Sequence, residues 1–252
     1  MIKTPFKLVL NTILLSLLVG MLVLPVALVH VVTGTAHVPA TVAGAQKTNE
    51  NLIVLPNFFD FSDHVSFSPE YVGYGYKDVL TLTSFRSQVA TYHKLYTVYN
   101  RSADPITVRG VLGEKPSPEN SFDSLVITMA KSGQEHSTKL ARPAAEGDVS
   151  MIATDASVAE GADYVVIEKM ELPVLSVTGR FITTDPLPKS LAQGDVVYRS
   201  GIFVADGKVY RSRTPDVVIA PGESITVNAV VVGKSDVETG SVTVPLFILG
   251  VN

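Results

Sequence analysis

The hydrophobic pattern of the chain changes character near residue 33. Leu8–Val32 is an apolar run, and no charged residue occurs between Lys7 and Lys47. As a helix, these 25 residues would span roughly 37 Å, more than the roughly 30 Å hydrocarbon core of a bilayer. Beyond the run, apolar and polar residues tend to alternate with a period of two residues. The pattern therefore predicts an N-terminal hydrophobic helix at residues 1–33, followed by β-structure.

The flanks of the apolar run predict its topology. Two lysines precede it and uncharged residues follow, so the positive-inside rule leaves the N-terminus in the cytoplasm and the rest of the chain outside. Pro25 would kink or end a helix, and small-residue cleavage candidates follow at Gly34-Thr35-Ala36 and Ala43-Gly44-Ala45. A retained transmembrane anchor and a cleaved signal segment both stay open, with residues 34–50 as the spacer or cleavage region.

Residues 51–252 alternate with a period of two. The longest uninterrupted strand pattern is Gln88–Asn100, and a polar turn connects it to Ile106–Leu112, which predicts two adjacent strands. About a dozen such segments recur at intervals near ten residues, with almost no helical periodicity. We expect one all-β domain at residues 51–252, an antiparallel β-sandwich of jelly-roll or Greek-key type.

Turn chemistry adds detail to this picture. Asp206-Gly207 suits the positive φ angles of a type I′ hairpin turn, and Pro221-Gly222 suits a type II turn. Pro245 lies inside the last apolar segment, Ser241–Val251, and cannot donate to a ladder. This segment is therefore predicted to be an edge strand or to carry a bulge.

The period of two is lost in the middle of the chain. Lys131–Gly161 gains Ala, Gly, Glu and Asp, which is typical of an insertion or a long loop. Asp155–Met170 is the one segment compatible with a helix, although Val165-Val166-Ile167 favours a strand in its second half. Val174–Thr184 is predicted to be a strand pair or a strand bent at Gly179.

Composition excludes several functional classes. The chain has no cysteine, which removes disulfides, thiolate catalysis and Cys-ligated metal sites. Lys3 and Lys7 account for two of the 20 basic residues, so 18 basic residues face 24 acidic ones beyond the apolar run. A net negative domain disfavours nucleic acid as a partner, because binding a phosphate backbone needs a basic surface.

No catalytic motif is present, so we expect a protein that is not an enzyme. The histidines have no metal-ligand spacing, and neither a nucleophile elbow nor a phosphate-binding loop occurs. Asp60 and Asp63, close to Asn57, are the candidates for a Ca²⁺ site, although turn aspartates more often bond to local backbone. No other cofactor is expected. A glycosidase with distant carboxylates stays open, but the absence of tryptophan disfavours it.

Two further segments suggest surface roles. Tyr71–Tyr76 interleaves aromatic residues with glycine, which fits either an extended edge or a platform for a sugar or partner protein. Asn100-Arg101-Ser102 is the single N-x-[ST] sequon, so Asn100 is the glycosylation candidate.

Three passages together resemble a known group of exported proteins. They are Lys94–Leu112, where a strand ends in Asn before a short polar turn, Val217–Val232, where a Pro-Gly-Glu-Ser turn starts a Val-rich strand, and the apolar strand Val242–Val251. These features are similar to the camelysin/TasA-like group, which includes biofilm fibre and archaeal pilus or cannula subunits. The resemblance implies a jelly-roll subunit that polymerises with copies of itself by donor-strand complementation.

In donor-strand complementation, an incoming strand supplies the hydrogen bonds that an open sheet edge lacks. The candidate donor here is the segment from Asn51 to Phe67. Its apolar residues are Leu52, Ile53, Val54, Phe59, Phe61, Val65 and Phe67. The alternative is that this segment pairs within its own domain.

We therefore predict an extracytoplasmic structural protein that contacts the membrane through its N-terminal segment and is anchored at the surface or assembled into a filament. The second hypothesis is a membrane-tethered accessory module that binds a glycan or a partner. A secreted hydrolase ranks third.

Overall fold

The computed structural model describes residues 51–57, 63–72 and 75–251. The chain divides into two units, Met1–Ala45 and Gln46–Asn252, and every described residue belongs to the second. The predicted N-terminal helix lies outside these residues. Within them, no helix combines the length and the apolar character that crossing a bilayer requires. The described part of the chain is all-β and antiparallel, as predicted, with one 3₁₀ turn, η1 (Ala156–Ala159).

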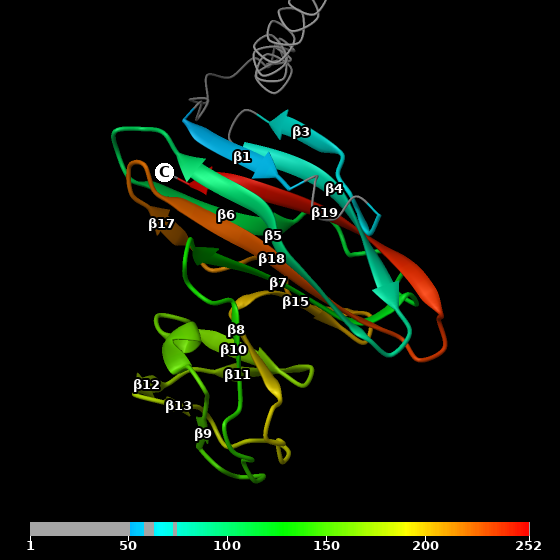
Figure 1. The fold of residues 1–252 in the computed structure, drawn as a ribbon, viewed down its shortest axis with the longest axis vertical. Coiled ribbons are helices and arrows are strands. Elements are labelled where there is room, and N and C mark those ends of the chain that lie inside the picture. The colour runs from blue at the N-terminus through cyan, green and yellow to red at the C-terminus, as the bar shows by residue number, and fades with distance from the viewer. Residues whose placement is uncertain (1–50, 58–62, 73–74, 252) are drawn as a thin grey trace, which may run out of the picture. The chain divides into compact units, whose positions relative to one another are not determined.

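Two six-stranded antiparallel sheets form the larger part of this unit (Figure 1). Sheet A has the order β1-β5-β18-β7-β15-β16, and sheet B has the order β17-β6-β19-β4-β2, with β3 also paired to β4. The strands of sheet A are β1 (Leu52–Pro56), β5 (Val89–Asn100), β7 (Phe122–Lys131), β15 (Gly201–Ala205), β16 (Lys208–Arg211) and β18 (Ser224–Gly233). The strands of sheet B are β2 (Val65–Ser66), β3 (Pro69–Val72), β4 (Gly75–Phe85), β6 (Ile106–Leu112), β17 (Val217–Ile219) and β19 (Thr239–Val251).

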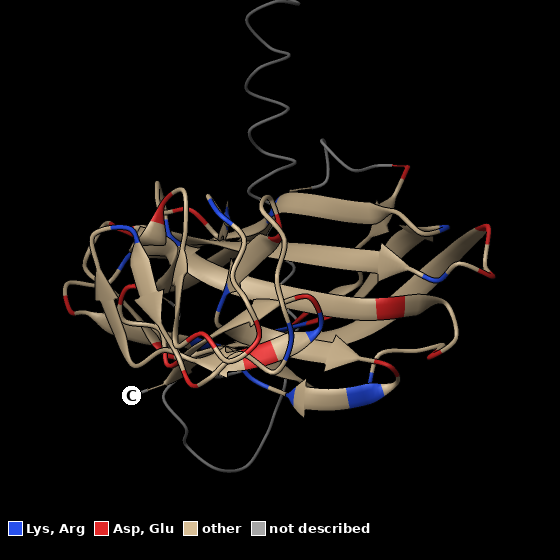
Figure 2. Cartoon of the chain, turned by 90° about the horizontal axis from the view of Figure 1, so that it is seen from below, with Lys and Arg blue, Asp and Glu red and all other residues tan. Residues whose placement is uncertain are grey.

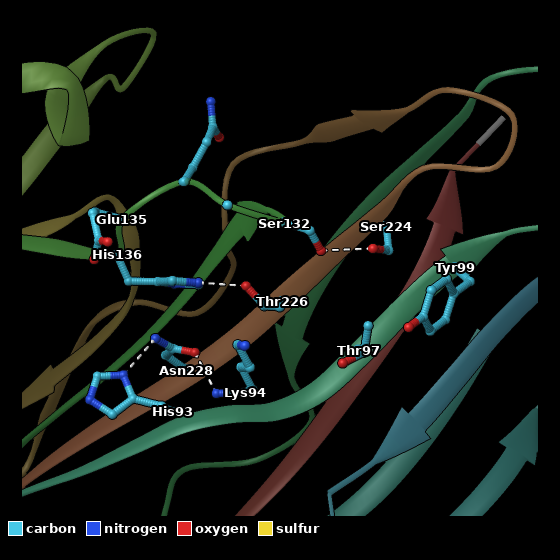
Figure 3. A pocket seen from close by; sticks show the side chains of 12 residues that line it. His93, Lys94, Thr97, Tyr99, Ser132, Glu135, His136, Ser224, Thr226 and Asn228 are labelled. Atoms are coloured by element: carbon cyan, nitrogen blue, oxygen red, sulfur yellow. Dashed lines mark hydrogen bonds between the residues drawn. The ribbon is translucent and has the colours of Figure 1, made fainter.

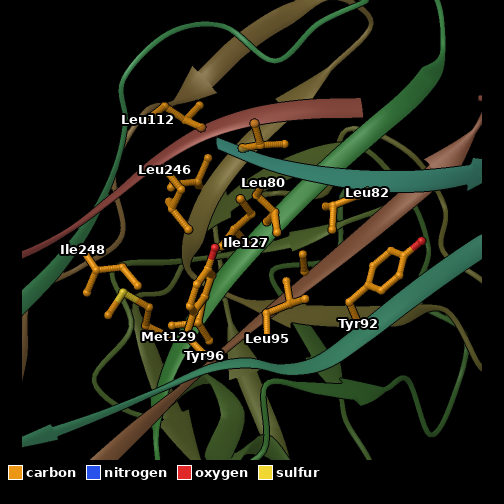
Figure 4. Packing of buried hydrophobic residues seen from close by; sticks show 14 of the residues in the cluster. Leu80, Leu82, Tyr92, Leu95, Tyr96, Leu112, Ile127, Met129, Leu246 and Ile248 are labelled. Atoms are coloured by element: carbon orange, nitrogen blue, oxygen red, sulfur yellow. The ribbon is translucent and has the colours of Figure 1, made fainter. Parts of the chain in front are cut away.

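One hydrophobic cluster joins the inward faces of the two sheets. In β4, Leu80 and Leu82 are fully buried, and they pack in the same cluster as Leu95 of β5 and Ile127 of β7 (Figure 4). Exposure alternates along β4 and β6, as it does in an antiparallel strand with one face against a core and one toward solvent. Each fully buried Leu or Ile side chain contributes about 2 kcal/mol relative to an exposed one.

Residues 132–200, between β7 and β15, form an inserted subdomain with its own hydrophobic cluster. Its two small sheets have the orders β11-β10-β14-β8 and β12-β13-β9. The strands are β8 (Ser137–Lys139), β9 (Ser150–Ile152), β10 (Tyr164–Ile167), β11 (Met170–Pro173), β12 (Ser176–Thr178), β13 (Phe181–Thr183) and β14 (Val196–Arg199). The predicted insertion therefore extends beyond Gly161 and is folded.

The outer face of sheet A is covered where this subdomain meets it. Val126 of β7 and Phe203 of β15 point away from the main core, and they cluster with Tyr164 and Val166 of β10. The Tyr164 hydroxyl donates to the Gly201 carbonyl oxygen at the point where the chain returns to sheet A. Because both faces of sheet A are covered here, burial does not alternate along β7 and β15.

Several turn predictions are confirmed. Asp206 and Gly207 connect β15 to β16 with φ angles of 49° and 71°, the two positive values of a type I′ turn. Gly222 has φ of 76° after Pro221, as a type II turn requires. Gly179 lies at the bend between β12 and β13, and Val165-Val166-Ile167 is within β10, while the helical part of Asp155–Met170 is limited to η1.

Two topological predictions are wrong. The segments Gln88–Asn100 and Ile106–Leu112 are strands, but they do not pair, because the turn between them carries the chain from sheet A to sheet B. The last strand, β19, is interior, between β6 and β4. The Gly113 N–H donates to the Pro245 carbonyl oxygen, just past the end of β6. The nitrogen and the carbonyl oxygen of one strand residue point to the same side. The Pro245 nitrogen therefore faces the β6 side of the strand, where the ladder with β6 has ended. No ladder bond to β4 is lost.

Candidate functional site

A polar cleft of about 470 Å³ lies on the outer face of sheet A, beside the chain segment that leads into the inserted subdomain (Figure 3). Strands β5 and β18 and the loop after β7 provide its walls. The lining residues are His93, Lys94, Thr97, Tyr99, Ser132, Gly133, Gln134, Glu135, His136, Ser224, Thr226 and Asn228. Hydroxyl, amide and imidazole groups therefore dominate the lining.

A bulge in β5 shapes one end of the cleft. The pairing of β5 with β18 shifts register between Val227 and Ala229, so His93 and Lys94 are extra residues opposite Asn228. The Lys94 backbone N–H donates to Asn228 Oδ1 at 2.7 Å, which leaves Asn228 Nδ2 to donate to His93 Nδ1 at 3.3 Å. The buried Asn228 side chain thus holds Lys94 at a φ of 53°, a left-handed conformation that is costly for lysine.

His136 closes the opposite wall. Its Nδ1 lies 2.7 Å from Thr128 Oγ1 and its Nε2 lies 2.8 Å from Thr226 Oγ1, so a neutral ring can donate at one nitrogen and accept at the other. Burial lowers the His136 pKa to about 4, and the nearby charges of Arg199 and His93 act in the same direction. The ring therefore stays neutral at physiological pH and attaches the subdomain linker to β7 and β18.

Three side chains along β5 have no partner among the described residues. They are the Lys94 ammonium, the Thr97 hydroxyl and the Tyr99 hydroxyl. Thr97 lies opposite Thr226 and Tyr99 lies opposite Ser224 across the ladder. The Tyr99 side chain is 38% exposed. The cleft therefore combines satisfied groups that hold its walls with free groups that can meet a ligand.

The second candidate site is the N-terminal edge of sheet A. Strand β1 pairs with β5 in the register Leu52↔Asn100, Ile53↔Tyr99 and Val54↔Val98, and β5 is its one partner strand among the described residues. Leu52 is 6% exposed, and Val54 packs against the same cluster. Alternate side chains of β1 thus enter the main core while Leu55 stays exposed.

The other residues of the predicted donor segment are distributed differently. Val65 is buried in β2, which pairs with β4, and the half-buried Phe67 contacts the Tyr96 ring edge-on at 5.5 Å. Phe59 and Phe61 lie outside the described residues, as does Asp60. In this structure the described strands of the segment pair within their own chain.

Asn100, the asparagine of the sequon, is buried and hydrogen-bonded through its side chain. Asn100 is 1% exposed, and its Nδ2 donates to the carbonyl oxygens of Asp104 at 2.8 Å and Ile219 at 2.9 Å. Its Oδ1 accepts from the Ser102 backbone N–H. A glycan on Nδ2 would have to displace these contacts from a buried position.

The tyrosine segment does not form one platform in the described residues. Tyr71 is 53% exposed on β3, whereas Tyr76, its partner across the β3–β4 ladder, packs against the buried Tyr96 ring. Gly73 and Tyr74 lie outside the described residues. Exposed aromatic surface here is therefore carried by Tyr71.

No metal-binding cluster of side chains is assembled within the described residues. Asp63 is exposed, and no group of three or more His, Asp or Glu side chains there is placed to hold a metal ion. Asp78 is a buried carboxylate whose pKa is raised by burial, but Oδ1 accepts from the Ser68 N–H and Oδ2 accepts from the Tyr96 hydroxyl. Its contacts attach the loop before β3 to the core.

Charge is dispersed over this unit. Lys and Arg alternate with Asp and Glu along the loops and strand ends (Figure 2). Many of them form exposed pairs, such as Lys131 with Glu223 at 3.2 Å.

Comparison with known proteins adds no relative. No family model matches the chain, and the search of curated proteins gave no match either.

Proposed function

We propose that this chain is a non-enzymatic structural protein that acts outside the cytoplasm, either anchored at the cell surface or assembled into a filament. The uncharged run Leu8–Val32 supports export. The hydrophobic cluster shared by sheets A and B supports a jelly-roll or Greek-key sandwich. The resemblance to the camelysin/TasA-like group supports assembly from identical subunits.

The observation that carries the filament proposal is the position of β1. It is an edge strand at the N-terminal end of its unit, and it connects to the rest of that unit only through the segment that leads to β2. An edge strand with one partner strand can leave its sheet by giving up the hydrogen bonds to that partner. Its core-facing side chains, Leu52 and Val54, match the alternate-residue pattern by which donor strands fill a groove.

The acceptor in this proposal is the groove that β1 leaves along β5. Removing β1 would uncover backbone groups such as the Leu95 carbonyl oxygen, which accepts from Asn57 N–H at 2.9 Å, and the Arg101 N–H, which donates to Asn51. An open edge of this kind is stabilised by pairing with another chain. The β1 segment of a second copy restores the same hydrogen bonds and the same core contacts.

Engineered cysteines test the exchange, since the chain has no cysteine of its own. One population carries Ile53→Cys and a second carries Tyr99→Cys, because these residues face each other in the β1–β5 register. The two populations are mixed under unfolding conditions, allowed to assemble, oxidised and analysed by non-reducing electrophoresis. Exchange predicts disulfide-linked dimers, because β1 of one chain then lies beside β5 of another.

The control mixture replaces Tyr99→Cys with Val218→Cys, an exposed position on β17 of the other sheet, and should give no dimer. A chain carrying both Ile53→Cys and Tyr99→Cys reports pairing within one chain. If assembled material gave only this internal disulfide, with no dimer in the mixture, the donor-strand proposal would be wrong.

The fate of the N-terminal segment separates anchoring from release. Mass spectrometry of the mature protein should find an N-terminus within residues 34–50 if the protein is released into a filament. An intact Met1 would contradict release and favour the tethered form.

A further inference from the structure

We propose that the cleft on sheet A binds an acidic saccharide, with the uronate carboxylate at Lys94 and a sugar ring against Tyr99. The volume of about 470 Å³ falls within the roughly 300–1,000 Å³ range of small-molecule sites. Such sites are usually lined by apolar side chains, whereas here every lining residue except Gly133 carries a polar or charged group. A ligand rich in hydroxyl groups fits a lining of this kind.

The floor of the cleft is a ladder of hydroxyl groups. Thr97 and Thr226 face each other across β5 and β18, as do Tyr99 and Ser224. Ser132 and Ser224 are 2.7 Å apart through their Oγ atoms, which holds the rim of the loop to the sheet. Hydroxyl groups both donate and accept hydrogen bonds, so a row of them can act as donors to, or acceptors from, the hydroxyls of a sugar.

Lys94 gives the cleft its preference for a negative group. Its ammonium has no anionic partner among the described residues, and its side chain stands between those of Asn228 and Thr97 (Figure 3). The carboxylate of Glu135 lies at the opposite end of the cleft from Tyr99 (Figure 3). A charge-assisted hydrogen bond to a uronate would be stronger than one to a neutral hydroxyl.

The backbone at Lys94 supports a role in binding. Lys94 has a left-handed backbone conformation that the buried Asn228 side chain holds in place, at a position where a glycine would adopt it more easily. Conformations of this cost cluster at ligand sites, where the surrounding structure holds a side chain in a required position. The bulge also presents His93, whose Nδ1 is occupied by Asn228, so that Nε2–H is left to donate.

Tyr99 supplies the apolar contact. Tyr99 is 38% exposed on the outer face of sheet A, opposite Ser224 and two residues along β5 from Thr97. A tyrosine ring offers an apolar face with a polar tip, which matches a sugar ring with its C–H face and its hydroxyl edge. The cleft also keeps its floor whether β1 comes from its own chain or from a neighbour, so the inference does not depend on strand exchange.

Binding can be measured on the full chain in a detergent without sugar headgroups. The probe is the trisaccharide of galacturonic acid, compared with the neutral trisaccharide of galactose, by isothermal titration and saturation-transfer NMR. The acidic probe should bind more tightly, and added salt should weaken it. Lys94→Met should weaken the acidic probe by about tenfold, the loss expected for one charge-assisted hydrogen bond. Tyr99→Ala should weaken both probes.

Two further variants control for folding and for general charge. Lys94→Arg keeps the cation at the bulge and should keep the preference for the acidic probe. Lys139→Met removes an exposed lysine of β8, outside the cleft, and should bind as the unmodified chain does. The inference would be overturned by absence of binding, by equal affinity for both trisaccharides, or by Lys94→Met and Lys139→Met behaving alike.

Discussion

At the scale of single residues, His136 has a defined structural role. Its ring lies between Thr128 of β7 and Thr226 of β18, while its backbone carbonyl oxygen accepts from Arg199 N–H at 3.0 Å. One residue therefore joins both linkers of the inserted subdomain to sheet A. The two threonine contacts are made with a neutral ring, and this makes the join sensitive to acid.

Replacing His136 should change how stability responds to pH. The pKa is about 4 in the folded chain against 6.5 in an unfolded one, so the unfolded chain binds more protons between these values. The stabilisation is fully present above pH 6.5 and is lost as the pH falls toward 4. Between pH 7 and pH 4, the free energy of unfolding of the wild type should fall by on the order of 3 kcal/mol more than that of His136→Gln.

Denaturant unfolding at several pH values measures this difference. His64→Gln, which removes an exposed histidine near Phe85, serves as the control and should keep the wild-type slope. Parallel pH profiles for wild type and His136→Gln would show that the buried ring does not carry the acid sensitivity.

The residues of the cleft could be predicted from sequence only in part. The sequence predicts the strand Gln88–Asn100, and in the structure β5 carries Thr97 and Tyr99 on one face, but no sequence pattern marked them as site residues. The bulge at His93 and Lys94 has no glycine or other local signal, because it is imposed by Asn228, 134 residues from Lys94 along the chain. Sequence patterns report local preference, whereas this feature depends on a tertiary contact.

At the scale of elements, strand existence was easier to predict than strand pairing. Ile106–Leu112 matches β6 residue for residue, and Asp206-Gly207 gives the expected hairpin. A short polar turn normally predicts pairing of the strands that it joins. Here the turn after β5 is organised by the buried Asn100 side chain, which bonds to Ile219 of β17 in the other sheet. The chain therefore crosses between sheets at a point where local sequence predicts a hairpin.

Asn100 should be important for the stability of this crossover. Asn100→Ala removes the two hydrogen bonds that Nδ2 donates and leaves the buried Ile219 carbonyl oxygen without its side-chain partner. The free energy of unfolding should therefore fall by about 2–3 kcal/mol. Asn120→Ala, at an exposed turn, is the matched control and should change stability by less than about 0.5 kcal/mol. Chemical denaturation compares the two, and equal small effects would contradict the structural role of Asn100.

At the scale of the whole described unit, two cores share one chain. The main cluster lies between sheets A and B, and the inserted subdomain has a separate cluster. A third, small cluster joins them through Val126 and Phe203 on the outer face of sheet A. The loss of alternation after Lys131 predicts an insertion, but it does not predict that the inserted segment would cover a sheet, because that depends on residues on both sides of the contact.

This arrangement predicts that removing the inserted subdomain exposes an apolar face rather than unfolding the main core. A variant in which a short Gly/Ser turn replaces residues 132–200 should keep its β-sheet signal, because β7 and β15 are already neighbours, with Gly201 opposite Thr128. It should also self-associate through the uncovered Val126 and Phe203 side chains. Adding Val126→Thr and Phe203→Thr to the shortened chain should restore a single species.

The same two substitutions in the full chain should instead lower the free energy of unfolding by several kcal/mol, since both side chains are buried there. Circular dichroism and size-exclusion chromatography with light scattering distinguish these outcomes. If the shortened chain lost cooperative unfolding with or without the threonines, the main core would depend on the subdomain for folding, and the two cores would be one cooperative unit.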